Sequence, residues 1–418
     1  MLIGGGALLG HLYLYLRLVR QLSPHGAWRR AMEGFLLVMT ALLVLRGPIR
    51  DLSPDIERVH ERVTYSWMAL AICLICASVA GDLVRLVAAL ARRMSSRARG
   101  SPASVRAISD VPSDDTTTAA VAAPRDGASS CLVASDDAAP SDPGRRELIT
   151  RVVPWAVVAS GGLGAMYGGY RAYAPPEVSE VALRLAKLPR TLDGLTIVQL
   201  TDVHVGPYIG RDFIDRLVAS ANALRPDVVA ITGDLVDGDV PTLGPAVSAL
   251  GNLRARYGTF FVTGNHEYYS GETEWTRFLE RLDIVVLRNR RVEIGDDGGK
   301  LDLVGVDDWG GRSRRRQGYD LEAALDGRDP ERAAVLLAHQ PTNFDVAVAR
   351  GVDVQLSGHT HGGQMFPMTR LVGLRYAYNR GLYREGDGHI YVSRGCGFWG
   401  PPARLDSPPE IVRLTLTT

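Results

Sequence analysis

Five short apolar runs between residues 195 and 364 end in the same way, and this repetition constrains the fold more than any other feature of the chain. Each run has the length of a buried strand and leads into an aspartate, asparagine or histidine, usually beside glycine. Helical spacing of apolar residues at 211–224 separates the first two runs. Strands that alternate with helices predict a layered α/β domain whose strand ends gather ligands. The runs, each given together with the residues that follow it, are LTIVQLTDVHVG (195–206), DVVAITGDLVDG (227–238), TFFVTGNHEYY (259–269), AAVLLAHQPTNFD (333–345) and VDVQLSGHTHGGQ (352–364).

The residues that follow these runs form a set of nitrogen and oxygen donors. Imidazole and carboxylate together suit Zn, Mn, Fe or Ni, whereas an all-oxygen Ca site would not recruit so many histidines. The set is too large for one ion, so it predicts two ions that share a bridging carboxylate. Two ions about 3.5–4 Å apart can clamp a phosphate and lower the pKa of a bound water. The candidates are Asp202, His204, Asp234, Asn265, His266, His339, His359 and His361.

With these motifs in this order, residues 175–418 resemble the calcineurin-like metallophosphoesterase superfamily, and most closely its bacterial branch with N-terminal membrane helices. The resemblance implies a four-layer α/β/β/α sandwich with a dinuclear centre at the strand ends. It implies that Asp202, His204 and His361 bind one ion and that Asp234 bridges both. The second ion would then be bound by Asn265, His339 and His359, so that the two histidines of GHTH serve different ions.

Two further residues are candidates for contact with the substrate. His266 of GNHE resembles the family's non-ligand histidine, which contacts the phosphate and can protonate the leaving oxygen. Arg394 lies in a Ser-Arg-Gly segment that also resembles this branch, and its guanidinium could contact a phosphate; a surface arginine beside a turn is the alternative. His266 and Arg394 are therefore the predicted catalytic residues.

The N-terminal part of the chain carries four apolar segments that are candidates for the bilayer. A spanning helix needs about 20 mostly apolar residues, and the third and fourth segments reach that length. The first two include charged residues or are short, so a hairpin on the membrane surface is the alternative for them. The segments are 1–19, 31–45, 64–91 and 152–170.

Arginines between these segments predict the topology. Arginine-rich stretches lie between the first two segments, after the third and before the fourth, whereas the stretch at 46–63 mixes basic with acidic residues. Positive loops stay in the cytoplasm, so the consistent solution has four spans and an extracytoplasmic catalytic domain. The expected location is the bacterial inner membrane. The expected divisions are three membrane helices in 1–94, a disordered linker at 95–147, a fourth membrane helix at 148–171 and a catalytic domain at 175–418.

These features predict a membrane-anchored hydrolase with two divalent ions, Mn, Zn or Fe, that acts on phosphate mono- or diesters, or a pyrophosphate, of an envelope or lipid-linked substrate. The reaction would proceed through a metal-activated water. One alternative is a UDP-2,3-diacylglucosamine pyrophosphatase-type enzyme of lipid A synthesis, which would require a cytoplasmic domain. Another is a catalytically idle membrane protein that binds phosphorylated ligands. The 47 basic and 46 acidic residues give a net charge of +1, which speaks against a nucleic-acid partner.

Overall fold

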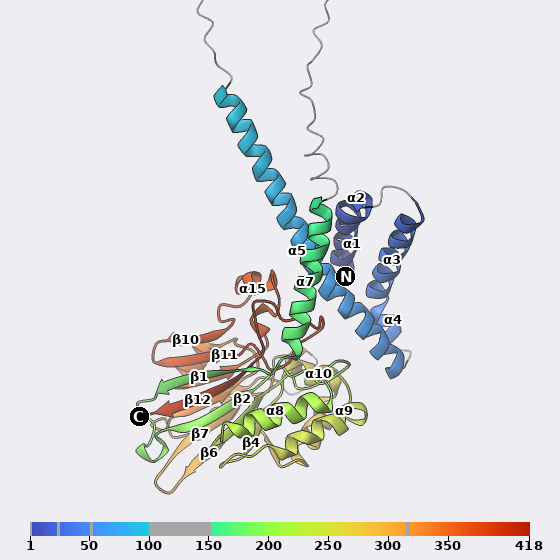
Figure 1. Cartoon of the computed structure of the whole chain (residues 1–418). Helices are drawn as coiled ribbons and strands as arrows, with labels where there is room; N and C mark the ends of the chain where they lie inside the picture. Colours follow the sequence, from blue (N-terminus) through green and yellow to red (C-terminus); the bar gives the residue numbers. More distant parts are fainter. Residues whose placement is uncertain (1, 23–25, 51–52, 100–151, 314–317) are drawn as a thin grey trace, which may run out of the picture.

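The computed structural model describes residues 2–22, 26–50, 53–99, 152–313 and 318–418. The region from 175 onward is a mixed α/β unit built on two six-stranded sheets, drawn in Figure 1. The first sheet has the order β1-β12-β2-β3-β4-β5 and the second has the order β10-β11-β9-β8-β7-β6. The strands are β1 (Glu177–Arg184), β2 (Leu195–Leu200), β3 (Val228–Thr232), β4 (Thr259–Val262), β5 (Ile284–Val286), β6 (Arg290–Asp296), β7 (Gly299–Gly305), β8 (Ala334–Leu337), β9 (Val354–Ser357), β10 (Gly381–Glu385), β11 (Gly388–Val392) and β12 (Glu410–Thr417).

The core is arranged in layers because successive residues of a strand point to opposite faces of the sheet. Ile197 of β2 packs in the cluster between the two sheets, whereas its neighbour Val198 packs against helices on the outer face. A third cluster joins the second sheet to two short helices. The resulting helix, sheet, sheet, helix order agrees with the expected sandwich. The helices are α8 (Arg211–Ala223), α9 (Val240–Val247), α10 (Asn265–Ser270), α11 (Glu272–Glu280), α12 (Gly310–Ser313), α13 (Leu321–Leu325), α14 (Phe344–Ala349) and α15 (Met368–Leu371).

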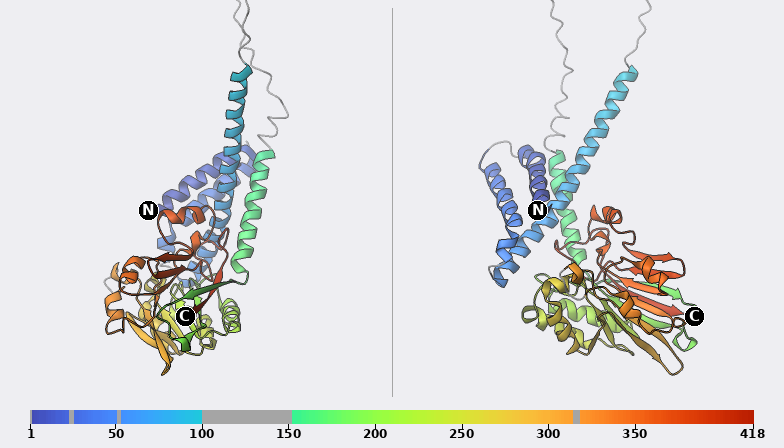
Figure 2. Two further views of the ribbon diagram at one scale, coloured as in Figure 1. Left: turned by 90° about the vertical axis from the view of Figure 1, so that its left-hand side faces the viewer. Right: turned by 180° about the vertical axis from the view of Figure 1, so that it is seen from behind.

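The N-terminal helices gather at one side of the sandwich, as all three views show (Figures 1 and 2). The longest, α5, has 46 residues, and α7 runs beside it. Gly161 of α7 permits this close approach, since a Cβ there would lie 2.8 Å from Leu74 Cδ2 and 3.0 Å from Leu74 Cα. These helices are α1 (Leu2–Leu14), α2 (Arg20–Leu22), α3 (Ala27–Val44), α4 (Arg46–Arg50), α5 (Pro54–Arg99) and α7 (Val153–Tyr173), with a π-helical turn at Tyr15–Val19.

Within the described residues, one helical segment, Asp55–Ala91 of α5, is long and apolar enough to cross a membrane. It contains the third predicted span. Helices also form at the other three predicted spans, but they do not reach the same length and hydropathy, so the four-span arrangement stays a prediction. The linker was expected to begin at residue 95, but α5 continues to Arg99. The rest of that linker, at 100–147, lies outside the described residues.

Candidate metal centre

The loops that follow five strands meet at one edge of the molecule. Strands β2, β3 and β4 are parallel neighbours in one sheet, and β8 and β9 are parallel neighbours in the other, so their carboxyl ends face the same way. The predicted site residues come two to four positions after these ends, for example Asp202 after Leu200 and Asp234 after Thr232. The strand-end pattern in the sequence therefore becomes a cluster in space.

Five of the predicted site residues have left-handed backbone conformations. This conformation costs a residue other than glycine about 1–3 kcal/mol and persists only where the surrounding structure imposes it. Backbone hydrogen bonds between the loops impose it here, including Asp202 N–H to Gly233 O at 3.1 Å and His204 N–H to Asp234 O at 3.1 Å. The five are Asp202 (φ 51°), His204 (φ 55°), Asp234 (φ 49°), His359 (φ 72°) and His361 (φ 50°).

Two glycines leave room for the carboxylates of the site. A Cβ at Gly264 would lie 2.2 Å from Asp234 Oδ1, and a Cβ at Gly358 would lie 2.1 Å from Asp202 Oδ2. Any side chain at either position would displace a predicted ligand. The glycines of GNHE and GHTH are thus required by the close approach of these carboxylates.

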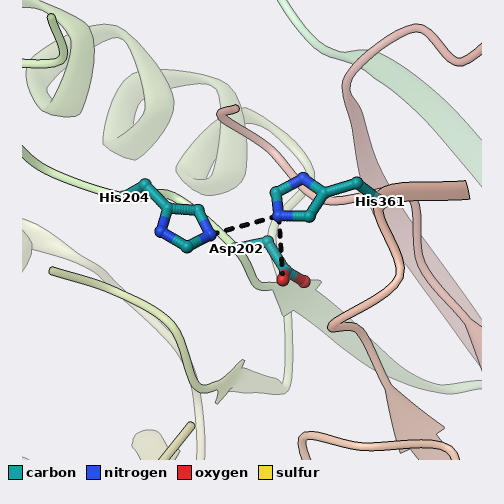
Figure 3. A group of neighbouring side chains, drawn as sticks. All are labelled: Asp202, His204 and His361. Atoms are coloured by element: carbon teal, nitrogen blue, oxygen red, sulfur yellow. Dashed lines mark hydrogen bonds and ion pairs between the residues drawn. The ribbon is translucent and has the colours of Figure 1, made fainter. Parts of the chain in front are cut away.

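Asp202, His204 and His361 form the first group of converging donors, shown in Figure 3. His204 Nε2 lies 3.1 Å from His361 Nε2, which in turn lies 3.4 Å from Asp202 Oδ1. The main-chain N–H of His359 donates to both oxygens of the Asp202 carboxylate, at 3.0 Å each, and holds it in place. Two imidazole nitrogens and a carboxylate oxygen at such distances suit a shared cation.

Asp234, His339 and His359 form the second group. His339 Nε2 lies 3.1 Å from Asp234 Oδ2 and 3.2 Å from His359 Nδ1. Asp234 Oδ2 is also 3.8 Å from His204 Nε2 of the first group, so this carboxylate lies between the two groups, where a bridging ligand would be. Asn265 follows β4, and its buried Oδ1 has no hydrogen-bond partner within the described part of the chain, as expected of an oxygen that awaits a ligand.

These observations show that the residues fit two divalent ions. Both groups mix nitrogen with carboxylate donors, which is the ligand set of transition metals. Burial lowers the pKa of His359 to about 3 and lowers that of His361 well below its ordinary value, so both imidazoles are neutral, as ligands must be. Burial would also lower the pKa of His339, but the charge of Asp234 raises it well above its ordinary value, so a proton and a cation compete for its Nε2.

Hydrogen bonds to the far ring nitrogens orient the histidines. His204 Nδ1 lies 2.9 Å from Asp237 Oδ1, and His339 Nδ1 lies 2.8 Å from Thr232 O. Both contacts leave Nε2 to face the centre. Such contacts fix the tautomer of a metal-binding histidine and the orientation of its ring.

Asp237 was not among the predicted residues, yet its Oδ1 also accepts a hydrogen bond from His266 Nδ1 at 2.6 Å. Burial alone would raise the pKa of Asp237, but His204 and His266 hold it well below its ordinary value. Burial would lower the pKa of His266, but Asp234 and Asp237 raise it to about 9. The structure therefore places His266 beside the centre, with Nε2 4.0 Å from Asp234 Oδ2.

Glu267, another residue without a predicted role, joins two of the loops. Its buried carboxylate accepts hydrogen bonds from the main-chain N–H groups of Gly264 at 2.6 Å, Asp234 at 3.0 Å and Leu235 at 2.7 Å. Burial, and then the charge of Asp234, raises the pKa of Glu267 to about 7. The last residue of GNHE thus positions the loop that carries Asp234.

Two arginines, Arg394 and Arg404, differ in the residues that they contact. Arg394, predicted to contact a phosphate, donates from Nη2 to Glu410 Oε2 at 2.7 Å and from Nε to the same oxygen at 3.0 Å. The structure therefore does not join it to the two donor groups, and its catalytic role stays a prediction. Arg404, which the sequence did not single out, is fully buried, and its Nη2 lies 2.9 Å from His361 Nδ1.

The chain is similar in sequence to known proteins and matches a family profile. The sequence profile described as calcineurin-like phosphoesterase matches residues 195–363. A Danio rerio protein named transmembrane protein with metallophosphoesterase domain is 40% identical over 261 residues, which cover 60% of this chain and 60% of that protein. A Helicobacter pylori metallophosphoesterase is 40% identical over 251 residues, covering 60% and 66%. The chain spans less than two thirds of these two relatives. An Aquifex aeolicus metallophosphoesterase is 35% identical over 245 residues, which cover 57% of this chain and 91% of that protein.

Proposed function

Since the chain belongs to the calcineurin-like metallophosphoesterase family, whose members hydrolyse phosphoesters, we propose that it is a membrane-anchored enzyme with a two-ion centre. Its substrate is a phosphate mono- or diester, or a pyrophosphate, of an envelope or lipid-linked compound. The observation that carries the proposal is the position of Asp234 Oδ2, which lies 3.8 Å from His204 Nε2 of one donor group and 3.1 Å from His339 Nε2 of the other. One carboxylate can therefore serve both ions.

The residues divide between the two ions as their positions suggest. When bound, two divalent ions, Mn, Zn or Fe, supply Lewis-acid charge for the phosphate and lower the pKa of water. The left-handed loops hold the donors in converging positions. The proposed ligands are Asp202, His204 and His361 for the first ion, Asn265, His339 and His359 for the second, and Asp234 for both.

His266 is proposed to handle the proton of the leaving group. Asp237 accepts a hydrogen bond from its Nδ1, which leaves Nε2 to face the pocket beside the centre. A proton carried on Nε2 can pass to the oxygen of the departing alcohol as the P–O bond breaks. Asp237 therefore orients this ring as well as that of His204.

Turnover by the purified full-length chain tests the function. After chelation and reloading with Mn, Zn or Fe, the protein should release p-nitrophenol from p-nitrophenyl phosphate or from its bis ester. Bound metal should approach two ions per chain in the active form. Phosphate binding without turnover under any of these metals would favour the catalytically idle alternative.

Topology separates the remaining substrate classes. The polar start of α5 contacts the catalytic domain, where Arg62 Nε donates to Pro207 O at 2.8 Å, which supports placing residues 46–63 and the domain on one side of the membrane. The arginine pattern supports a position outside the cytoplasm for that side. The name of the Danio rerio relative also supports a membrane anchor. A reporter fused after Thr418 should be active outside; activity inside would favour the nucleotide-sugar pyrophosphatase alternative.

A further inference from the structure

The candidate metal centre opens into a pocket that two distant parts of the sequence share. The centre contributes His204, Asp237 and His266 to the lining. The N-terminal helices contribute Arg46 of α4 and Glu61 and Tyr65 of α5. A substrate whose phosphate reaches the centre from this pocket therefore has its organic group against the N-terminal helices.

Hydrogen bonds fix this helical wall, defined as Arg46, Glu57, Glu61 and Tyr65, to the catalytic domain. The hydroxyl of Tyr208 donates to Arg62 O at 2.7 Å and lies 3.1 Å from Ser66 Oγ. These contacts come from the residues directly around Tyr65. The wall is thus held at the pocket by the domain itself.

The pocket is aromatic on the side of His266. The His266 ring lies 5.2 Å from the ring of Tyr269 and 6.0 Å from that of Trp399, measured between centroids. Rings of this kind provide apolar contact and attract cations to their faces. The aromatic residues of the lining are Tyr65, Tyr208, Tyr269, Phe398 and Trp399.

The charged side chains of the wall differ in the partners that they already have. Arg46 already has two partners within the wall. Its Nη2 lies 3.0 Å from Glu61 Oε1, and its guanidinium lies over the ring of Tyr65, 5.0 Å from the centroid. The lining also carries the carboxylate of Glu57, on the same helix as Glu61, and that of Asp237, whose Oδ1 already contacts His204 and His266. An anionic group in the pocket would meet carboxylates, with Arg46 engaged, whereas a neutral or cationic group would meet aromatic faces and acids.

We propose that this pocket is the subsite for the organic group of the phosphoester, and that the helical wall selects a neutral or cationic group over an anionic one. The inference rests on the proposed function and narrows its substrate class. It assigns to α4 and α5 a part in substrate recognition in addition to anchoring.

Three matched aryl esters test the inference on the full-length protein in nanodiscs. They are the phosphates of phenol, of tyramine and of 3-(4-hydroxyphenyl)propionate, whose far ends carry no charge, an ammonium and a carboxylate. Each is offered as the monoester and as the methyl diester, and the released phenol is quantified by chromatography. Comparing each variant with the wild type cancels the intrinsic reactivities of the esters.

The double variant Glu57→Gln/Glu61→Gln removes two carboxylates and releases Arg46 from its partner. Its ratio of kcat/KM for the tyramine ester to that for the propionate ester should fall about tenfold, with a gain on the propionate ester. A gain is not expected if the wall has only a structural role. Asp55→Asn, an exposed acid of the same helix outside this lining, should keep the wild-type ratio.

An unchanged ratio in the double variant, or a proportional loss on all three esters, would overturn the inference while leaving the enzyme assignment intact. A wild type that turns over none of the esters with any metal would overturn both.

Discussion

The candidate metal centre and the helical wall face the same pocket but are built in opposite ways. The centre lies on loops after strands, most of its side chains are buried, and five of its residues have left-handed backbone. The wall lies on helices, and the side chain of Arg46 is 40% exposed. An irregular, buried constellation can fix donors for chemistry, whereas residues on a regular helix can change without disturbing the fold. Substitutions in the centre should therefore abolish activity, and those at the wall should adjust selectivity.

The largest effect is expected from Asp234→Asn. Asparagine tolerates the left-handed backbone, so the change removes the shared charge with little strain. The value of kcat/KM for bis(p-nitrophenyl) phosphate should fall about 1,000-fold, which corresponds to about 4 kcal/mol. Asp283→Asn, an exposed aspartate with φ of 60°, is the matched control and should keep full activity. A loss below tenfold for Asp234→Asn would contradict the expectation that substitutions in the centre abolish activity.

The two histidines of GHTH test whether the centre binds two ions through different ligands. Glycine adopts left-handed backbone without strain, so His359→Gly and His361→Gly remove the donors without straining the loop. Elemental analysis should find about one ion per chain in each single variant instead of about two, and close to none in the double variant. If the double variant still held one ion, the two histidines would serve the same ion and the assignment would be wrong.

Asp237→Asn tests the residue that orients both His204 and His266. Loss of such an orienting carboxylate typically costs 10–100-fold in metal affinity or activity, and about that loss is expected here. Asp239→Asn two residues later is the control, since asparagine can replace aspartate at the N-cap, where Asp239 accepts a hydrogen bond from the Thr242 N–H at 3.0 Å. Equal effects of the two changes would show that Asp237 acts only on local structure.

The smallest effect is expected where the wall docks on the domain. Tyr208→Phe removes the hydroxyl that contacts Arg62 O and Ser66 Oγ. A single hydrogen bond contributes about 1 kcal/mol, so kcat/KM should fall about fivefold or less, mainly through KM. Tyr257→Phe removes a buried hydroxyl that lacks a partner in the described part of the chain and should have no effect. A large loss of kcat in Tyr208→Phe would mean that the wall contributes to the chemical step.

Much of the centre could be predicted from the sequence because its information is local. Each donor follows within four residues of a strand end, and parallel strands bring those ends to one edge. Asp202, Asp234 and Asn265 follow neighbouring strands of one sheet and could therefore be assigned to one edge without knowing how the two sheets pack. The same reasoning anticipated the glycines beside them.

The orienting residues were missed because their roles depend on contacts between loops. Asp237 lies in GDLVDG and Glu267 in GNHE, so both were visible as further carboxylates of recognised motifs. Nothing in the sequence shows that Asp237 reaches His204, which precedes it by 33 positions. A carboxylate a few residues after a predicted ligand is the signal that could have found them.

Arg394 and the helical wall show where prediction from sequence ends. Arg394 was predicted to contact phosphate, but β12 brings Glu410 beside it, and this pairing depends on how the last strand joins the sheet. The polar start of α5 reads as a membrane loop, and hydropathy cannot tell that Tyr65 lines a pocket with His266. Both facts depend on tertiary packing.

Because α5 is continuous, helix geometry relates the position of the pocket to that of the candidate membrane span. The wall residues Glu57, Glu61 and Tyr65 and the apolar part of the candidate span lie on one uninterrupted helix. An α-helix turns about 100° and rises about 1.5 Å per residue, so one residue inserted after Tyr65 would rotate the wall relative to the candidate span. Two full turns, about seven residues, would restore the angle but displace the wall by about 10 Å. With the proposed anchoring, the number of residues between the wall and the candidate span would set the height of the active site above the membrane.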